Sequence, residues 1–202
     1  GQSLTIDAAA EMVVAGGLAT GGLTNNGDLV AVSTAIDGPV VNNNNVTVVG
    51  TVDFNGPVSG PGDFFGPGTA NFNGGLAPGA SPAEVSFEGD VALADTNTLF
   101  IEIGGTTPGS QYDSLIVGGS AALDGILDVD LINGFTPTAG QQFSVLSAGN
   151  ITDNGLVLAG PAADLFNLLI GNSSVVLQAT GNLPGDYNFD AALEKLRPIV
   201  GD

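Results

Sequence analysis

The chain has 202 residues with 21 Asp or Glu, two Lys or Arg, no His and no Cys, and its net charge at pH 7 is −19. Because both cations, Lys195 and Arg197, lie near the C-terminus, the chain lacks the basic surface that nucleic acids and anionic membranes require. The missing His and Cys exclude histidine-based triads, zinc–thiolate sites, disulfides and thiol catalysis.

The remaining composition indicates an all-β protein with a buried core. Apolar residues make up 43% of the chain, and 32 Gly and 11 Pro divide them into many short runs. No run is long enough for a transmembrane helix, so we expect no membrane insertion. The polar start of the chain is typical of a processed or truncated N-terminus. The acidity favours a secreted or cell-surface protein, because salt and divalent ions outside the cell screen self-repulsion.

Short apolar segments recur along the whole chain. They are 4–6, 12–14, 29–32, 46–54, 85–87, 99–103, 115–117, 126–132, 143–146 and 175–177. Several alternate with period two, which is typical of strands buried on one face. Helical periodicity is weak before residue 185, although residues 162–169 could form a turn or two.

Echoes of repetition favour a solenoid. The segment 15–21 resembles 73–79, and 89–93 resembles 119–123. Coils that cannot bury their own apolar face stack on their neighbours. We therefore predict a β-solenoid body over 1–182 and a tail over 183–202, and a Gly-rich β-sandwich is the alternative.

Two polar or irregular segments are ambiguous. The four asparagines 42–45 form either a polar loop or a ladder of amides stacked between solenoid coils. The segment 56–79 is dense in Gly and Pro, and we interpret it as a long loop or irregular coil whose Phe64, Phe65 and Phe72 pack on the core.

Carboxylates are the only catalytic side chains present in quantity. Asp128 and Asp130 alternate with apolar residues, which places them on one strand face with Cα atoms about 7 Å apart. Paired acids can hydrolyse glycosides, but a solvated acidic face is the favoured interpretation and we expect no enzyme activity.

Residues 74–180 resemble a known family in several ordered motifs. These are the run 75–82, the pattern 100–113 (FIEIGGTTPGSQYD), and the segments 118–123, 131–137 and 143–149. The order resembles the C-terminal part of secreted bacterial proteins with autotransporter-associated β-strand repeats, common in planctomycete-like bacteria. This resemblance implies a right-handed parallel β-helix with an extracellular structural or adhesive role.

The tail contains part of a calcium-loop pattern. The run 185–190 (GDYNFD) resembles the opening of a dockerin-type segment, in which Asp186, Asn188 and Asp190 occupy loop positions 1, 3 and 5 and would bind Ca²⁺. Ala191 replaces the glycine of position 6, and Arg197 replaces the acidic ligand of position 12. The alternative is a short helix over 188–197, capped by Asp190 and ended by Pro198.

Two functions from different classes are compatible with these features. The first is a non-enzymatic structural or adhesive surface protein, such as a filament subunit, whose partners are other copies of itself or cell-surface and matrix glycans. Leu4, Ile6 and Val13 would add a strand to a neighbour, and Lys195 and Arg197 would contact its acidic surface. The second is an accessory module of a secreted carbohydrate-active or dockerin-type scaffold protein.

Overall fold

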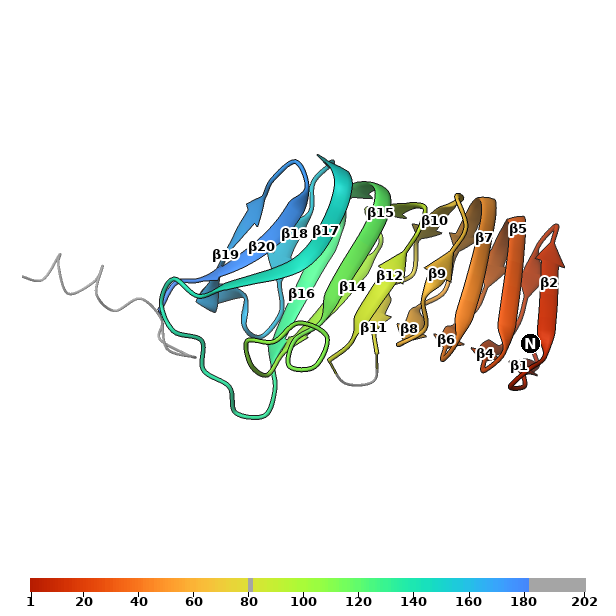
Figure 1. The fold of residues 1–202 in the computed structure, drawn as a ribbon, viewed down its shortest axis with the longest axis horizontal. Helices are drawn as coiled ribbons and strands as arrows, with labels where there is room; N and C mark the ends of the chain where they lie inside the picture. The colour runs from red at the N-terminus through yellow and green to blue at the C-terminus, as the bar shows by residue number, and fades with distance from the viewer. Residues whose placement is uncertain (80–81, 182–202) are drawn as a thin grey trace, which may run out of the picture.

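The computed structural model describes residues 1–79 and 82–181, whose strands form coils stacked along the long axis of the molecule (Figure 1). Sheet A contains the eight strands β1 (Ser3–Ile6), β4 (Gly22–Asn25), β6 (Val40–Asn42), β8 (Val58–Gly60), β11 (Leu76–Pro78), β14 (Thr98–Ile103), β16 (Ile126–Leu131) and β18 (Val157–Ala159). Sheet B contains the twelve strands β2 (Glu11–Ala15), β3 (Leu18–Ala19), β5 (Asp28–Asp37), β7 (Asn45–Phe54), β9 (Phe64–Phe65), β10 (Thr69–Phe72), β12 (Glu84–Phe87), β13 (Asp90–Leu93), β15 (Ser114–Leu123), β17 (Gln142–Asp153), β19 (Phe166–Ile170) and β20 (Ser174–Ala179).

Strand pairing identifies a solenoid-like architecture. Every strand pairing is parallel except those of β20 with β17 and with β19. The all-β prediction is therefore confirmed, with the parallel sheets expected of a β-solenoid rather than the antiparallel sheets of a sandwich. The helix among the described residues is one 3₁₀ turn, η1 (Ala163–Leu165). The expected tail 183–202 and its helix lie outside the described residues.

The coils lengthen from the N-terminal to the C-terminal end. Hydrogen bonds between neighbouring coils join residues 17 apart at Asn44–Gly27, 18 apart at Asn71–Asp53 and 30 apart at Ser120–Asp90. The additional residues of the longer coils include the loops 104–113 and 132–141, which lie between strands of sheets A and B. The regular spacing is therefore confined to the first half of the body.

In-register stacking builds the core from columns of apolar side chains. On sheet A, one column of paired inward positions extends from the first coil to the last. It consists of Leu4, Leu23, Val40, Val58, Leu76, Leu99, Leu127 and Leu158. Its six central members are buried. Each coil thus covers the apolar face of the coil before it, which no single coil could bury alone.

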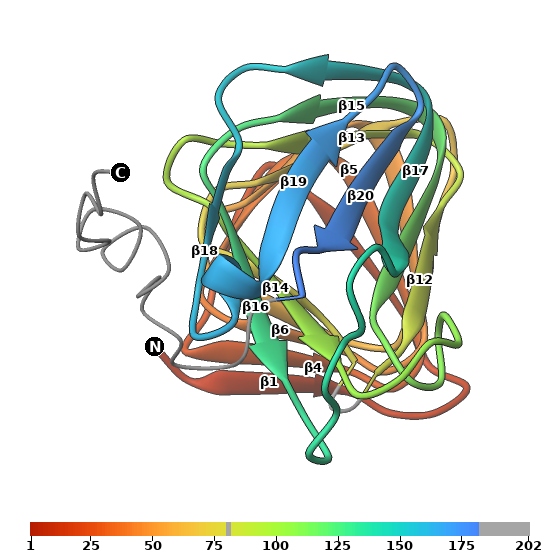
Figure 2. The same cartoon turned by 90° about the vertical axis from the view of Figure 1, so that its left-hand side faces the viewer.

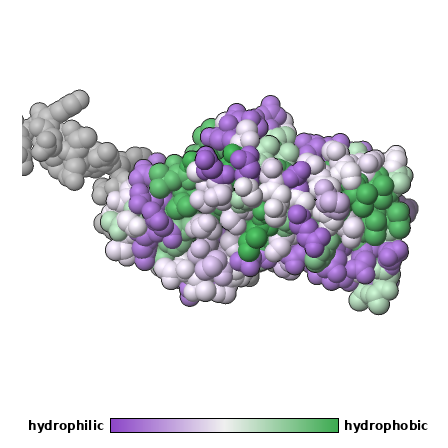
Figure 3. Space-filling model, turned by 45° about the horizontal axis from the view of Figure 1, so that its top comes forward, coloured by the Kyte–Doolittle hydropathy of each residue, from purple (hydrophilic) through white to green (hydrophobic). Residues whose placement is uncertain are grey.

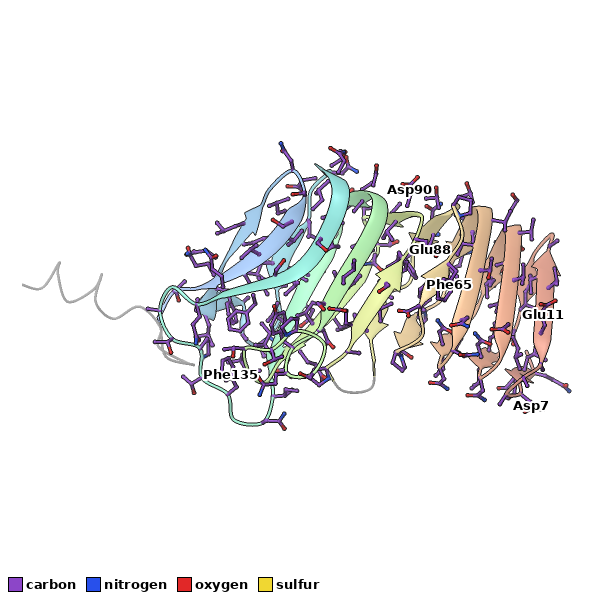
Figure 4. The ribbon with its side chains drawn as sticks, in the orientation of Figure 1. Asp7, Glu11, Phe65, Glu88, Asp90 and Phe135 are labelled. Carbon is purple, nitrogen blue, oxygen red and sulfur yellow. The ribbon has the colours of Figure 1, made fainter. Side chains whose placement is uncertain are left out.

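The segment 56–79 is one complete coil and the start of the next, not the long loop expected from its Gly and Pro content. It contains β8, β9, β10 and β11, because Gly and Pro occupy the corners and leave short strands between them. Its buried phenylalanines do pack on the core as expected: Phe72 stacks on Phe54 with ring centroids 5.2 Å apart, and Phe64 stacks on Phe87 at 4.6 Å. Phe65 instead lies exposed on the surface (Figure 4).

The four asparagines 42–45 bond back to the preceding coil. Buried Asn42 accepts a hydrogen bond from Asn25 Nδ2 at 2.8 Å, and Asn43 and Asn44 donate to Asn26 Oδ1 and the Gly27 carbonyl. The fourth, Asn45, donates to Asp28 Oδ1 at 3.2 Å. Each asparagine therefore bonds to the residue 17 positions back, as in a ladder between coils, but only Asn42 and Asn43 pair with another asparagine amide.

The two ends of the solenoid differ. At the C-terminal end, β19 and β20 form an antiparallel hairpin that crosses the end of the coils (Figure 2). At the N-terminal end, β1 pairs only with β4, and β2 only with β5. Leu4 is 36% exposed there, whereas its register partner Leu23 is 1% exposed. The first coil therefore leaves its inward face partly uncovered.

The corner at Gly60 should accept no other residue. Gly60 has φ +112°, and a Cβ built on it would lie against the carbonyl group of Asn42 on the preceding coil. We expect Gly60→Ala to reduce the free energy of unfolding by about 2–4 kcal/mol, because it combines backbone strain with a steric clash. Chemical denaturation measures this, and Gly134→Ala is the matched control, since Gly134 has φ +67° and open space around it. Equal losses in the two variants would contradict the close packing of the coils.

The buried asparagine pair should matter more than the exposed pair beside it. Asn42→Ala removes the acceptor for Asn25 Nδ2 inside the core and leaves a small cavity, so we expect a loss of about 1–3 kcal/mol. Asn43→Ala removes an equivalent but exposed bond to Asn26 and should cost less than about 1 kcal/mol. Urea unfolding of both variants tests the difference, and an equal cost would show that burial adds nothing.

Candidate functional site

An external groove on sheet A is lined by several acidic side chains. Its volume is about 400 Å³, and it crosses β11, β14 and β16. Its lining includes Ala77, Phe100, Glu102, Asp128, Asp130 and Pro161. The exposed Phe100 ring and the small or cyclic side chains form apolar surface, while the carboxylates come from the outward positions of two adjacent strands. The groove therefore combines an apolar wall with strong negative charge.

Strand register places like charges opposite each other in this groove. Glu102 of β14 is directly paired with Asp130 of β16, and Phe100 is paired with Asp128. Directly opposed like charges on neighbouring strands destabilise a sheet. No Lys or Arg precedes residue 195, so no cation of the described chain can compensate.

Elsewhere on the body, acidic side chains accept hydrogen bonds from asparagine amides of the next coil. The Nδ2 of Asn55 donates to Asp37, and that of Asn71 donates to Asp53, each at 2.7 Å. Glu11 and Asp28 are also paired in register, but Asp28 accepts a bond from an asparagine of the next coil. Within the described residues, the pair in the groove has no such amide donor.

Asp113, which also lines the groove, fixes the loop 104–113 to two coils. This carboxyl group is 2% exposed, and it accepts hydrogen bonds from the backbone N–H groups of Ala83 at 2.7 Å and Glu102 at 2.8 Å. Burial raises the pKa of Asp113 to about 7, although the two N–H donors act in the opposite direction. Because both of its oxygens already accept backbone hydrogen bonds, we assign Asp113 a structural role in holding the groove.

Asp128 and Asp130 lie together as the sequence predicts, but the sequence predicts only some of the residues that surround them in the groove. Period-two alternation correctly places Asp128 and Asp130 on one face of β16, and the weaker alternation of 100–103 places Phe100 and Glu102 outward on β14. What the sequence does not indicate is that these strands are neighbours in this register, because the coil joining them is much longer than the earlier ones. Asp113 carries no periodic signal at all.

The residues expected to mediate assembly differ in their accessibility. Leu4 and Ile6 lie on the same face of β1, but Ile6 is 3% exposed and so is already covered by its own chain. Val13 on β2 is 59% exposed. Figure 3 shows hydrophobic surface gathered over the N-terminal coils. These three positions therefore share one end of the solenoid without forming a single patch.

The predicted calcium ligands Asp186, Asn188 and Asp190 lie outside the described residues, as do Lys195 and Arg197. Within residues 1–79 and 82–181, no group of three or more acidic side chains is arranged to hold a metal ion. The same residues contain no helix long and apolar enough to cross a bilayer.

Comparison with known proteins adds no relative. No protein-family model matches the chain, and no curated protein sequence matches it.

The protonation of Asp113 should be visible in the stability of the protein. Because its folded pKa is raised above that of an unfolded aspartate, the folded state retains a proton between about pH 4 and pH 7 that the unfolded state has released. Its contribution to stability is therefore full below about pH 4 and is lost as the pH rises towards 7.

The variant Asp113→Asn tests this dependence. The asparagine side chain has one oxygen, so its NH₂ group would face one of the two backbone N–H donors and that hydrogen bond would be lost. We therefore expect destabilisation of about 1–3 kcal/mol at low pH. The difference in melting temperature between wild type and variant should narrow from pH 4 to pH 8. A difference that stays constant over this range would show that the native carboxyl group is ionised throughout.

Proposed function

We propose that this protein is a non-enzymatic extracellular structural or adhesive surface protein that assembles end to end into filaments. In this proposal the solenoid is a right-handed parallel β-helix, and the chain is related to the secreted bacterial proteins with autotransporter-associated β-strand repeats. Matrix or cell-surface glycans are the proposed adhesion partners.

The observation that carries this proposal is that, among the described residues, sheet A has an unpaired strand edge at each end. The sheet begins with β1 and ends with β18, and each of these strands has one partner within the sheet. Unpaired strand edges readily accept another strand. Addition of β1 of one copy to β18 of the next would continue sheet A across subunits, a head-to-tail contact that repeats without closing.

Apolar side chains at both edges support the same contact. Leu4 on β1 lacks the covering coil that buries its counterparts, and Val157 on β18, at an outward position in register with Ile126, is 60% exposed. Joining the two edges would remove apolar surface of Leu4 from water. Ile6 would support this edge from within, and Val13 would lie at its rim on β2.

Substitutions at the two edges of sheet A, compared with one inside the body, test whether the edges carry the contact between subunits. We expect the wild-type chain to form filaments visible by negative-stain electron microscopy and to sediment as polymers. Leu4→Asp and Val157→Asp should each abolish polymers, because either change places a charge at the junction. Val41→Asp is the matched control: Val41 is 39% exposed on sheet A but lies within the body, so polymers should persist.

The experiment has clear contrary outcomes. A wild-type chain that stays monomeric across salt and millimolar Ca²⁺ would overturn filament formation. Polymers that survive both edge substitutions, or that disappear equally with Val41→Asp, would show that sheet A does not carry the contact. Far-UV circular dichroism melts of each variant confirm that the solenoid remains folded, and Val157→Asp is informative even if Leu4→Asp loosens the first coil.

A further inference from the structure

The acidic groove on sheet A is chemically suited to an organic cation with an apolar neighbour. Glu102, Asp128 and Asp130 present three carboxylates beside the exposed ring of Phe100, within a groove of about 400 Å³. An ammonium or guanidinium group pairs with carboxylates through charge-assisted hydrogen bonds, and its apolar stem can lie on an aromatic ring. Such a group would also relieve the repulsion between Glu102 and Asp130.

The chain itself contains one segment of this chemistry. Its only cations, Lys195 and Arg197, lie two residues apart in the sequence Leu193-Glu194-Lys195-Leu196-Arg197-Pro198. With Glu194 the segment carries a net charge of +1, and Leu193 and Leu196 add apolar side chains. This composition complements the groove in both respects.

The last described residues place the start of the tail close to the groove. The Thr180 N–H donates to the Leu165 carbonyl at 2.9 Å, at the end of η1. At the other end of η1, Ala162 donates to the Val129 carbonyl at 3.1 Å, between the two groove aspartates, and Pro161 lines the groove. After β20 the chain runs back towards β16 and β18 (Figure 2).

The length of the tail permits this contact. Lys195 follows Gly181 by 14 positions, which span at most about 46–50 Å when extended. The separation across η1 is far smaller, roughly 6–8 Å for a 3₁₀ turn. The cations can therefore reach the groove of their own chain.

We propose that residues 193–198 bind in the groove of the same chain, with Lys195 and Arg197 paired to Glu102, Asp128 and Asp130 and with Leu196 against Phe100. This inference does not depend on filament formation. It assigns the two cations to a contact within one subunit, and so it leaves the edges of sheet A to carry any assembly.

The absence of Cys makes a labelling test direct. A nitroxide attached at Ala192→Cys is the only label in the chain, and its paramagnetic effect is read from the amide cross-peaks of a ¹⁵N-labelled sample. We expect loss of the cross-peaks of Phe100, Asp128 and Asp130, and their recovery in about 1 M salt, where the Debye length falls to about 3 Å. Amides near the tail root, such as Gly140, should broaden in either condition. The same label at Ala8→Cys should leave the groove amides intact.

Paired neutralisation identifies the charges involved. Asp128→Asn with Asp130→Asn should restore the groove cross-peaks, whereas Asp7→Asn with Glu11→Gln, which removes equal charge at the opposite end, should not (Figure 4). If the wild-type chain polymerises, the Val157→Asp background keeps the sample monomeric. Failure of filament formation therefore leaves this test unaffected.

Two results would overturn the inference. The first is a label at Ala192→Cys that broadens no groove amide, or broadens them equally after the groove aspartates are neutralised. The second comes from a mixture of ¹⁵N-labelled protein without a nitroxide and ¹⁴N protein that carries the nitroxide. Loss of the groove cross-peaks in that mixture would show that the tail binds a second copy instead of its own chain.

Discussion

The parallel hydrogen-bonded register between coils is the constraint on which the rest of this structure depends. Because the ladder fixes which residue lies above which, an inward position on one coil is inward on every coil, and the core grows as columns. The column from Leu23 to Leu127 on sheet A is apolar without interruption. A shift of one residue in any of these strands would turn the inward side chains of that strand to solvent.

The same register acts on polar and charged positions. Inside the body it places Asn25 beneath Asn42, so that a buried amide finds its partner in the neighbouring coil. On the surface it places Asn55 over Asp37 and Asn71 over Asp53, so that each amide donates to a carboxylate of the preceding coil. These bonds tie neighbouring coils together outside the core.

Local sequence patterns were enough to predict the strands and their inward faces, because period-two alternation and Gly-rich corners are local properties. They were not enough for the segment 56–79, where strands as short as β9 show no periodicity and corner residues dominate the composition. Groove geometry was equally inaccessible. The pairing of Glu102 with Asp130 depends on how many residues of the intervening loop 104–113 stay outside the paired strands. The role of Asp113 is visible only from its hydrogen bonds to the two coils that it joins.

Coil length also explains why the groove lies where it does. In the short N-terminal coils nearly every residue belongs to a strand or a corner, so the surface follows the backbone closely. Where the coils lengthen, additional chain must leave the ladder, and it leaves from β14 and β16, the two strands whose outward acids line the groove. The buried Asp113 returns one loop to the ladder at the groove, and η1 holds the opposite wall. A cavity with an acidic lining is therefore built at the transition from regular to extended coils, beside the point from which the segment that carries Lys195 and Arg197 departs.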